Sequence, residues 1–428
     1  MCAQVPRSSL GRLHYAWIAA GVTFVTLLAA AGARAAPGVL IVPLCNQFQW
    51  SRAKVSAIIS VTILFYGLVG PFAAALYERL GLRRTMLLSM GLLGGGYALS
   101  TFATAYWHFM LLWGVVVGIG SGMSATVLGA AVANRWFYER RGLVTGVLIA
   151  SSATGQLIFL PTLAAAVTAH GWRSAPLIVA LGCAAAVPVI ALVMRNKPAD
   201  LGLGRYGEAY RPEDPGAPRR NPVGIAFQTL AEAVKVRDFW FLSASFFVCG
   251  ASTNGLIGTH LVSAAFDCGI PEVTAASLLA MMGLFDLVGT TASGWLSDRV
   301  NSRYLLFGYY GLRGLSLLFL PKALSGPPIL LTIFAVFYGL DWIATVPPTV
   351  RLTGDVFGPA KAGIVFGWIA AAHQVGAACA TYSAGYVRTV FGTYSPAFVG
   401  AGILCIIAAG GVVAIARPPE AGPRGAPA

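Results

Sequence analysis

Four charged side chains lie inside long apolar segments of this sequence, namely Arg34, Asp286, Arg313 and Asp341. An ionised side chain at the centre of a membrane-spanning helix costs roughly 2.5–3.5 kcal/mol on insertion scales, so each needs a partner or a function. A guanidinium can hold a carboxylate through two parallel hydrogen bonds. A carboxylate poised between desolvation and a nearby cation can exchange a proton. These residue types therefore indicate chemistry on organic anions and protons.

Arg34 lies about two-thirds of the way along the first apolar segment. We predict that its guanidinium anchors the anionic substrate. Two alternatives are a structural ion pair with Asp341 and exposure near the outer mouth of the protein.

The other three charges lie in the second half of the chain. Asp286 and Arg313 are near the middle of neighbouring segments, which is compatible with a mutual ion pair or with a functional carboxylate. Asp341 is followed by Pro347-Pro348, which would break its helix and leave carbonyls facing a cavity. We predict Asp341 and Asp286 as proton-coupling residues, and Asp341 and Arg313 as further substrate contacts.

His373 and Gln374 lie one turn beyond Trp368 and could donate hydrogen bonds to an organic anion. The alternative, which holds also for His260, is a hydrogen-bonded packing histidine. No residues have metal-ligand spacing. We expect no metal and no cofactor, with a proton gradient as the driving force.

The elements that must position these residues are membrane helices. Hydrophobic residues make up 57% of the chain and charged residues only 10%, against roughly 25% charged in soluble domains. With about 20 apolar residues needed per span, we predict an all-α polytopic membrane protein with twelve transmembrane helices. They cover residues 15–44, 53–77, 85–104, 107–134, 143–168, 175–194, 239–265, 273–296, 304–321, 328–350, 363–386 and 396–416.

The basic residues predict the orientation. Of 29 Lys and Arg residues, 22 lie in the two tails or in loops on the same side as the tails, and five lie in the opposite loops. By the positive-inside rule both termini are cytoplasmic, and we expect a bacterial inner membrane. The rule also accounts for the net charge of +14 without a nucleic-acid partner.

A polar stretch divides the chain into two halves. Residues 195–238 cannot bury a core, so we predict a cytoplasmic linker with a short amphipathic helix around 226–236. The predicted organisation is a tail at 1–14, a six-helix half at 15–194, the linker, a second half at 239–416 and a tail at 417–428. The halves repeat at an offset of about 220 residues, as Gly142-Leu-Val-Thr-Gly146 and Gly363-Ile-Val-Phe-Gly367 illustrate. Such parallel repeats place a substrate site between them, near the membrane midplane.

Acidic and basic residues also recur at the same loop of each half. A carboxylate at a helix end, followed by arginines across a tight turn, can bond a neighbouring helix end in one conformation and release it in another. We predict a gate formed by Glu78, Arg79, Arg83 and Arg84 in the first half and by Asp298, Arg299 and Arg303 in the second. The alternative is that these arginines only anchor the topology.

Two groups of motifs carry a family resemblance over residues 15–416. Tyr77-Glu-Arg-Leu-Gly-Leu-Arg-Arg84 resembles the inner-loop signature of the major facilitator superfamily. Gly32-Ala-Arg34 with Pro37-Gly38, Gln49-Trp50-Ser51-Arg52 and Arg135-Trp-Phe resembles its monocarboxylate transporter-like and oxalate/formate antiporter-like branch. Monocarboxylate transporters place a Lys in helix 1 and Asp-x-x-x-Arg in helix 8. This chain has Arg34 and Asp286-Leu-Val-Gly-Thr290, so the exact recognition set differs.

We therefore expect a secondary transporter of small, monocarboxylate-like organic anions, working by proton symport and alternating access, with a monomer as the functional unit and lipids around it. The alternatives are an anion exchanger, proton-coupled efflux of other small molecules, and a non-transporting membrane sensor. The sequence does not predict an enzyme, because a P-loop or a Ser-His-Asp set is lacking. Gly118-Ile-Gly-Ser-Gly122 resembles a dinucleotide loop, but it lies in an apolar segment, where with Gly114 it predicts close helix packing.

Overall fold

The computed structural model describes residues 14–124, 126–208 and 222–415. Almost all of the predicted tails (1–14 and 417–428) and the Pro-rich centre of the linker lie outside these ranges. Within them the chain is helical, without a β-strand, which confirms the all-α prediction. Nine helical runs in the described ranges are long and apolar enough to cross a membrane.

Each predicted segment falls on one helix or on a run of consecutive helices. The first half contains α1 (Tyr15–Phe48), α2 (Arg52–Arg79), α3 (Leu82–Ser100), the run α4 (Tyr106–Phe109), η1 (Met110–Val117), α5 (Gly118–Met123) and α6 (Thr126–Trp136), then α7 (Arg141–His170) and α8 (Ser174–Val193). The second half contains the run α10 (Arg237–Gly250), η3 (Ala251–Ile257) and α11 (Gly258–Asp267), then α12 (Glu272–Ser297), α13 (Ser302–Ser325), α14 (Pro328–Asp341), α15 (Val346–Phe357), α16 (Pro359–Phe391) and α17 (Ser395–Val413).

The linker holds a 3-10 turn, η2 (Pro198–Leu201), and helix α9 (Pro222–Ala233). α9 begins about four residues before the predicted linker helix at 226–236. Proline is favoured in the first turn of a helix, where its missing N–H would have no partner, so Pro222 sets the start of α9.

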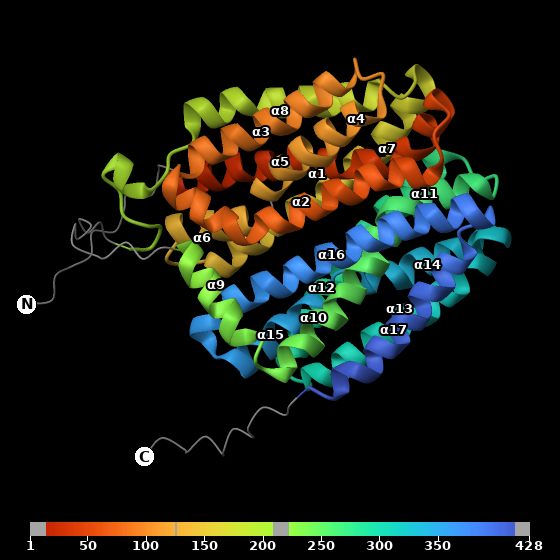
Figure 1. Ribbon diagram of the computed structural model, residues 1–428. Coiled ribbons are helices and arrows are strands. Elements are labelled where there is room, and N and C mark those ends of the chain that lie inside the picture. The colour runs from red at the N-terminus through yellow and green to blue at the C-terminus, as the bar shows by residue number, and fades with distance from the viewer. Residues whose placement is uncertain (1–13, 125, 209–221, 416–428) are drawn as a thin grey trace, which may run out of the picture.

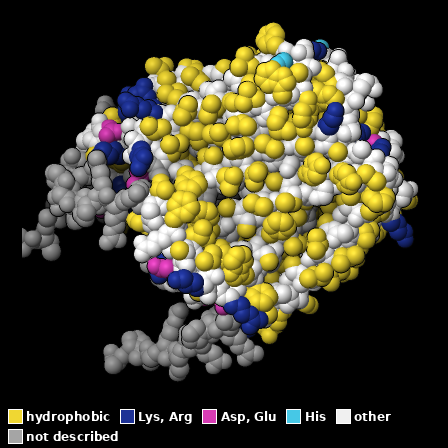
Figure 2. Space-filling view, in the orientation of Figure 1, with side chains coloured by type: hydrophobic (Ala, Val, Ile, Leu, Met, Phe, Trp, Pro, Cys, Tyr) yellow, Lys and Arg dark blue, Asp and Glu magenta, His cyan; other side chains and the backbone are white. Residues whose placement is uncertain are grey.

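The two halves form two bundles that face each other along α2 and α16 (Figure 1). Hydrophobic side chains cover the flank of the molecule, whereas most Lys and Arg side chains in view lie at the ends of the helices (Figure 2). We call the end at which α9 lies the linker end and the opposite one the distal end. The linker end is the predicted cytoplasmic side.

The internal repeat reappears in side-chain contacts. Arg83, in the first turn of α3, donates a hydrogen bond to the carbonyl of Ala191 near the end of α8. Arg303, in the first turn of α13, donates to the carbonyls of Val413 (3.3 Å) and Ile415 (3.0 Å) at the end of α17. In each half, therefore, an arginine ties the third helix to the last one.

Ion pairs join the halves at the distal end, and aromatic packing joins them at the linker end. At the distal end Asp267 of α11 bonds both Arg52 of α2 (3.2 Å) and Arg388 of α16 (2.6 Å). We call these three residues the distal latch. At the linker end Phe227 of α9 packs against Phe72 of α2 and Trp368 of α16.

Glycines allow close helix contacts, as their spacing in the sequence predicts. A Cβ at Gly118 would lie 2.9 Å from the carbonyl oxygen of Thr62, and one at Gly122 would lie 2.9 Å from that of Tyr66, both on α2. The Gly118–Gly122 stretch is therefore a packing face and not a nucleotide loop.

One glycine contact gives a direct test of packing in the second half. A Cβ at Gly289 of α12 would lie 1.8 Å from the carbonyl oxygen of Leu340 on α14, whereas a Cβ at Gly294 of α12 would meet nothing within 4 Å. We expect Gly289→Ala to destabilise the protein by about 1–3 kcal/mol through overpacking. Gly294→Ala should leave the Tm of the purified protein unchanged, and equal Tm values for the two variants would contradict this contact.

The distal latch predicts a change in accessibility. Cys45 of α1 lies beside Arg52. In a chain carrying Cys268→Ser and Cys379→Ser, we expect Asp267→Asn to accelerate labelling of Cys45 by a membrane-impermeant maleimide by a few-fold, because a partly exposed ion pair contributes up to about 1 kcal/mol. Arg173→Gln is the matched control, since Arg173 bonds the Thr101 carbonyl within its own half. An unchanged labelling rate in Asp267→Asn would show that the ion pairs do not hold this end closed.

Candidate functional site

The site is built around a break between α14 and α15. α14 ends at Asp341 and α15 begins at Val346, with Pro347 and Pro348 in its first turn. Prolines donate no backbone hydrogen bond and clash with the preceding turn, so the helix cannot continue through residues 342–345. In a membrane interior the backbone groups freed in this way need partners from the protein.

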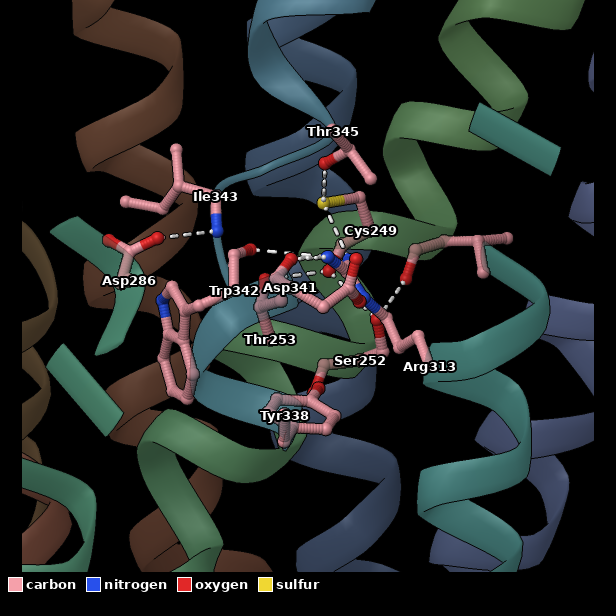
Figure 3. Close-up of polar contacts among 11 residues, drawn as sticks. Cys249, Ser252, Thr253, Asp286, Arg313, Tyr338, Asp341, Trp342, Ile343 and Thr345 are labelled. Carbon is pink, nitrogen blue, oxygen red and sulfur yellow. Dashed lines mark hydrogen bonds and ion pairs between the residues drawn. The ribbon is translucent and has the colours of Figure 1, made fainter. Parts of the chain in front are cut away.

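Side chains from α12 and α13 supply these partners (Figure 3). Arg313 of α13 donates to the carbonyls of Asp341 and Trp342, the latter at 3.2 Å. The N–H of Ile343 donates to Asp286 Oδ1 of α12 at 2.9 Å. In addition, Ser293 Oγ of α12 donates to the Ala344 carbonyl at 2.5 Å. Buried polar side chains thus bond the backbone at the end of α14 and within the break, from Asp341 to Ala344.

Arg313 is the centre of this network. Its side chain is 0% exposed, and its Nε donates to Asp341 Oδ2 at 2.6 Å. Its Nη1 donates to Cys249 Sγ at 2.9 Å, and Cys249 Sγ lies 3.2 Å from Thr345 Oγ1. A buried ion pair is tolerated only when further hydrogen bonds satisfy the remaining donors, and these carbonyl and thiol contacts do so.

The two carboxylates have different surroundings. Asp286 Oδ1 accepts from Thr290 Oγ1 at 2.8 Å as well as from Ile343. Asp341 Oδ1 is buried and has no hydrogen-bond partner in the described part of the chain. The structure thus pairs Arg313 with Asp341 and not with Asp286, so the mutual Asp286–Arg313 pair considered from the sequence is wrong.

Arg34 lies in the other half of the molecule. It is half-buried on α1, next to Ala33, whose carbonyl accepts a hydrogen bond from Tyr97 of α3 at 2.5 Å. The alternative pairing of Arg34 with Asp341 is wrong, because Asp341 bonds Arg313 instead. α1 packs against α7 and also against α11 of the second half. Arg34 therefore belongs to a helix that contacts both halves.

His373 and Gln374 lie on α16, between the network and the first half. The His373 ring packs 4.8 Å from that of Phe246, and a Cβ at Gly250 would lie 1.8 Å from the His373 carbonyl oxygen. Gln374 packs against Gly67 of α2. His260 is a packing residue, with Nε2 bonded to the Thr381 carbonyl at 2.9 Å.

The sequence does not indicate Cys249 as a member of the site, because a single cysteine in an apolar segment is typical of a small buried hydrophobic residue. Cys249 lies in an apolar segment that comes to lie beside Asp341 only after folding, so its position in the sequence gives little indication of a role. Thr290 was visible in the Asp286-x-x-x-Thr290 pattern, but its hydrogen bond to Asp286 was not predicted.

Within the described ranges, the predicted gate residues make no hydrogen bond or ion pair to the opposite half. Glu78 and Arg79 are exposed and make no hydrogen bond or ion pair within the described ranges. Asp298 pairs with Arg351 at 2.9 Å, and Arg299 lies over the ring of Trp295 at 4.1 Å. Arg83 and Arg303 do bond neighbouring helix ends, as a gate requires, but release in a second conformation stays a prediction.

The chain matches known transporters over most of its length. A family model described as Major Facilitator Superfamily matches residues 22–378 and, separately, 243–428. A Bacillus subtilis protein named uncharacterized MFS-type transporter YcxA is 24% identical over 86% of this chain and 87% of its own length. Monocarboxylate transporter 13 of Rattus norvegicus is 27% identical over 88% of this chain and 83% of its own length.

A solved structure has the same fold. It is a bacterial homolog of the human lysosomal transporter Spinster, in an inward-facing and unoccupied conformation. It superimposes with a TM-score of 0.67 at 15% identity and covers 94% of this chain and 96% of its own. The match of the family model over most of the sequence, together with the membrane helices, shows that this chain is an integral membrane transporter of the major facilitator superfamily.

Proposed function

We propose that this transporter carries small carboxylates together with protons. The observation that carries the proposal is the buried Asp341 carboxylate, which has one oxygen on Arg313 and the other without a donor. A buried acceptor without a partner is unfavourable by roughly 1–3 kcal/mol, and a proton on that oxygen removes the carboxylate charge. The names of the monocarboxylate transporter relatives support a carboxylate as the substrate class.

In this proposal the negative charge of the substrate is balanced by the proton that is transported with it. The substrate carboxylate binds the Arg34 guanidinium, and Asp341 takes up a proton. Neutral Asp341 attracts Arg313 less strongly, so the contacts of Arg313 with the break between α14 and α15 also weaken. Protonation of Asp341 would thereby alter the contacts of the broken helix in the second half while the anion is bound in the first half. The loaded transporter then changes conformation with little net charge buried. Asp286 is the second candidate for proton coupling, and Arg313, His373 and Gln374 are further candidate substrate contacts.

A second candidate is an anion exchanger of the oxalate/formate type. Asp286 and Arg313 are both bonded to the backbone at the break, and such bonds suit purely structural groups. In an exchanger the carboxylates of the second half would hold the fold, and Arg34 would bind one anion at a time without proton movement.

The first experiment measures uptake of radiolabelled monocarboxylates into proteoliposomes, with and without an inward proton gradient. We expect uptake that the gradient stimulates. Arg34→Ala should reduce it at least about tenfold, because a hydrogen bond to a charged group contributes about 1.5–3 kcal/mol. Arg34→Lys, which keeps the charge but not the bidentate geometry, should retain part of the uptake. Failure of the folded wild-type protein to take up any carboxylate would remove the proposal.

A second experiment separates the structural from the coupling role of Asp341. Asp341→Asn leaves Arg313 buried without a counter-charge, which costs about 3–5 kcal/mol. The double variant Asp341→Asn with Arg313→Gln removes both charges and should recover much of the lost thermal stability. We expect the double variant to exchange labelled carboxylate across the membrane but not to accumulate it in response to a proton gradient. Accumulation at the wild-type level would assign Asp341 to structure alone and transfer the proton-coupling role to another group, with Asp286 the next candidate.

A further inference from the structure

A cavity of about 480 Å³ lies at the linker end, beside the turn between α2 and α3. Leu80, Arg83, Arg84, Leu87 and Asn196 line it. Two guanidinium groups and one carboxamide thus meet two leucines in one pocket, and this pocket is separate from the network around Arg313. Its composition suits a ligand with an anionic part and an apolar part.

The cations of the pocket are only partly satisfied. The Arg83 backbone N–H donates to Asn196 Oδ1 at 3.0 Å, and its guanidinium bonds the Ala191 carbonyl, which carries no net charge. Arg84 is exposed and has no hydrogen bond or ion pair in the described parts of the chain. Two neighbouring cations without a carboxylate partner favour a phosphate, which guanidinium groups bind through charge-assisted hydrogen bonds.

An apolar track leaves this pocket along α3. Arg84, Leu88, Gly91, Gly95 and Leu99 are spaced by three or four residues and therefore share one face of the helix. Leu88 is 46% and Leu99 59% exposed, and a Cβ at Gly91 or Gly95 would meet nothing within 4 Å. The face is thus open and bounded by leucines, with space for a hydrocarbon chain in the membrane beside it.

The corresponding position of the second half lacks these features. At an offset of 220 residues Arg83 and Arg84 correspond to Arg303 and Tyr304. Arg303 is buried, bonds the end of α17 and lies beside the Tyr304 ring. The second half thus retains the arginine that ties two helices together, Arg303, but has Tyr304 where the first half has Arg84. Holding the helices together therefore does not explain Arg84.

We propose that this pocket binds the phosphate headgroup of an anionic phospholipid, with Arg83 and Arg84 on the phosphate and an acyl chain along the open face of α3. Basic pockets between membrane helices on the cytoplasmic side are suited to anionic headgroups. A free phosphate ester shares the headgroup chemistry but makes no use of the apolar track, and for this reason we assign the site to a lipid.

The test measures binding to the purified full-length protein in detergent by native mass spectrometry, with phosphatidylglycerol, phosphatidylcholine and glycerol phosphate as the probes. We expect saturable binding of phosphatidylglycerol in preference to the other two. Arg84→Ala should weaken it about fivefold, in line with roughly 1 kcal/mol per basic residue near the membrane surface. Tyr304→Ala, at the corresponding position of the second half, is the matched control and should bind as the wild type does.

A second variant tests the apolar track without touching the charges. Gly91→Leu fills open space on α3 and should weaken phosphatidylglycerol binding while leaving the Tm of the lipid-free protein unchanged. Equal binding of phosphatidylcholine, or an unaltered affinity in Arg84→Ala, would overturn the headgroup assignment. Glycerol phosphate binding as tightly as phosphatidylglycerol, with Gly91→Leu having no effect, would identify a soluble-anion site instead of a lipid site.

Discussion

The architecture of the second half depends on one constraint, which is that polar backbone groups cannot remain unpaired in a membrane interior. Pro347 and Pro348 break the helix that carries Asp341, and the freed groups are bonded by side chains of α12 and α13. Close helix contacts follow from this need. A Cβ at Gly339 would lie 2.8 Å from the Met282 carbonyl oxygen, so α12 and α14 approach closely enough for Asp286 to reach the break.

In the proposed mechanism, the same network connects the uptake of a proton to the movement of a helix. Arg313 bonds both the Asp341 carboxylate and the carbonyls at the end of α14, so any change in the carboxylate charge is felt by the helix break. Contacts at both ends of the molecule also join the halves. The distal latch joins α2, α11 and α16 through charges, while α9 contacts the linker ends of α2 and α16 through aromatic rings. Ion pairs such as those of the distal latch can separate where water can solvate the charges. Aromatic rings such as those at the linker end are favoured at the membrane surface.

Composition, span length and repeat spacing are enough to predict the helical segments. They also predict that Arg83 and Arg303 occupy equivalent positions in the two halves. The proline pair correctly located the break after Asp341. The partners at the break were not predictable, because a hydrogen bond such as Arg313 to Cys249 joins residues 64 positions apart and leaves no periodic signal. Because Asp286 and Arg313 lie on neighbouring segments, the sequence suggests an ion pair between them. The broken helix, however, provides both a carboxylate and free backbone carbonyls. Together these accept more of the hydrogen bonds of a guanidinium than a carboxylate alone.

The departure from the monocarboxylate transporter pattern then has a structural explanation. The resemblance implies a helix 8 Asp followed by Arg four residues later, and this chain has Asp286 followed by Thr290. The Thr290 hydroxyl and the Ile343 N–H supply two neutral donors to Asp286, so Asp286 needs no adjacent cation. The guanidinium lies instead on α13, where it acquires Asp341 as its counter-charge and the helix break as its second partner. In this chain the ion pair therefore involves the broken helix and not α12, and the same guanidinium bonds both the carboxylate and the backbone at the break.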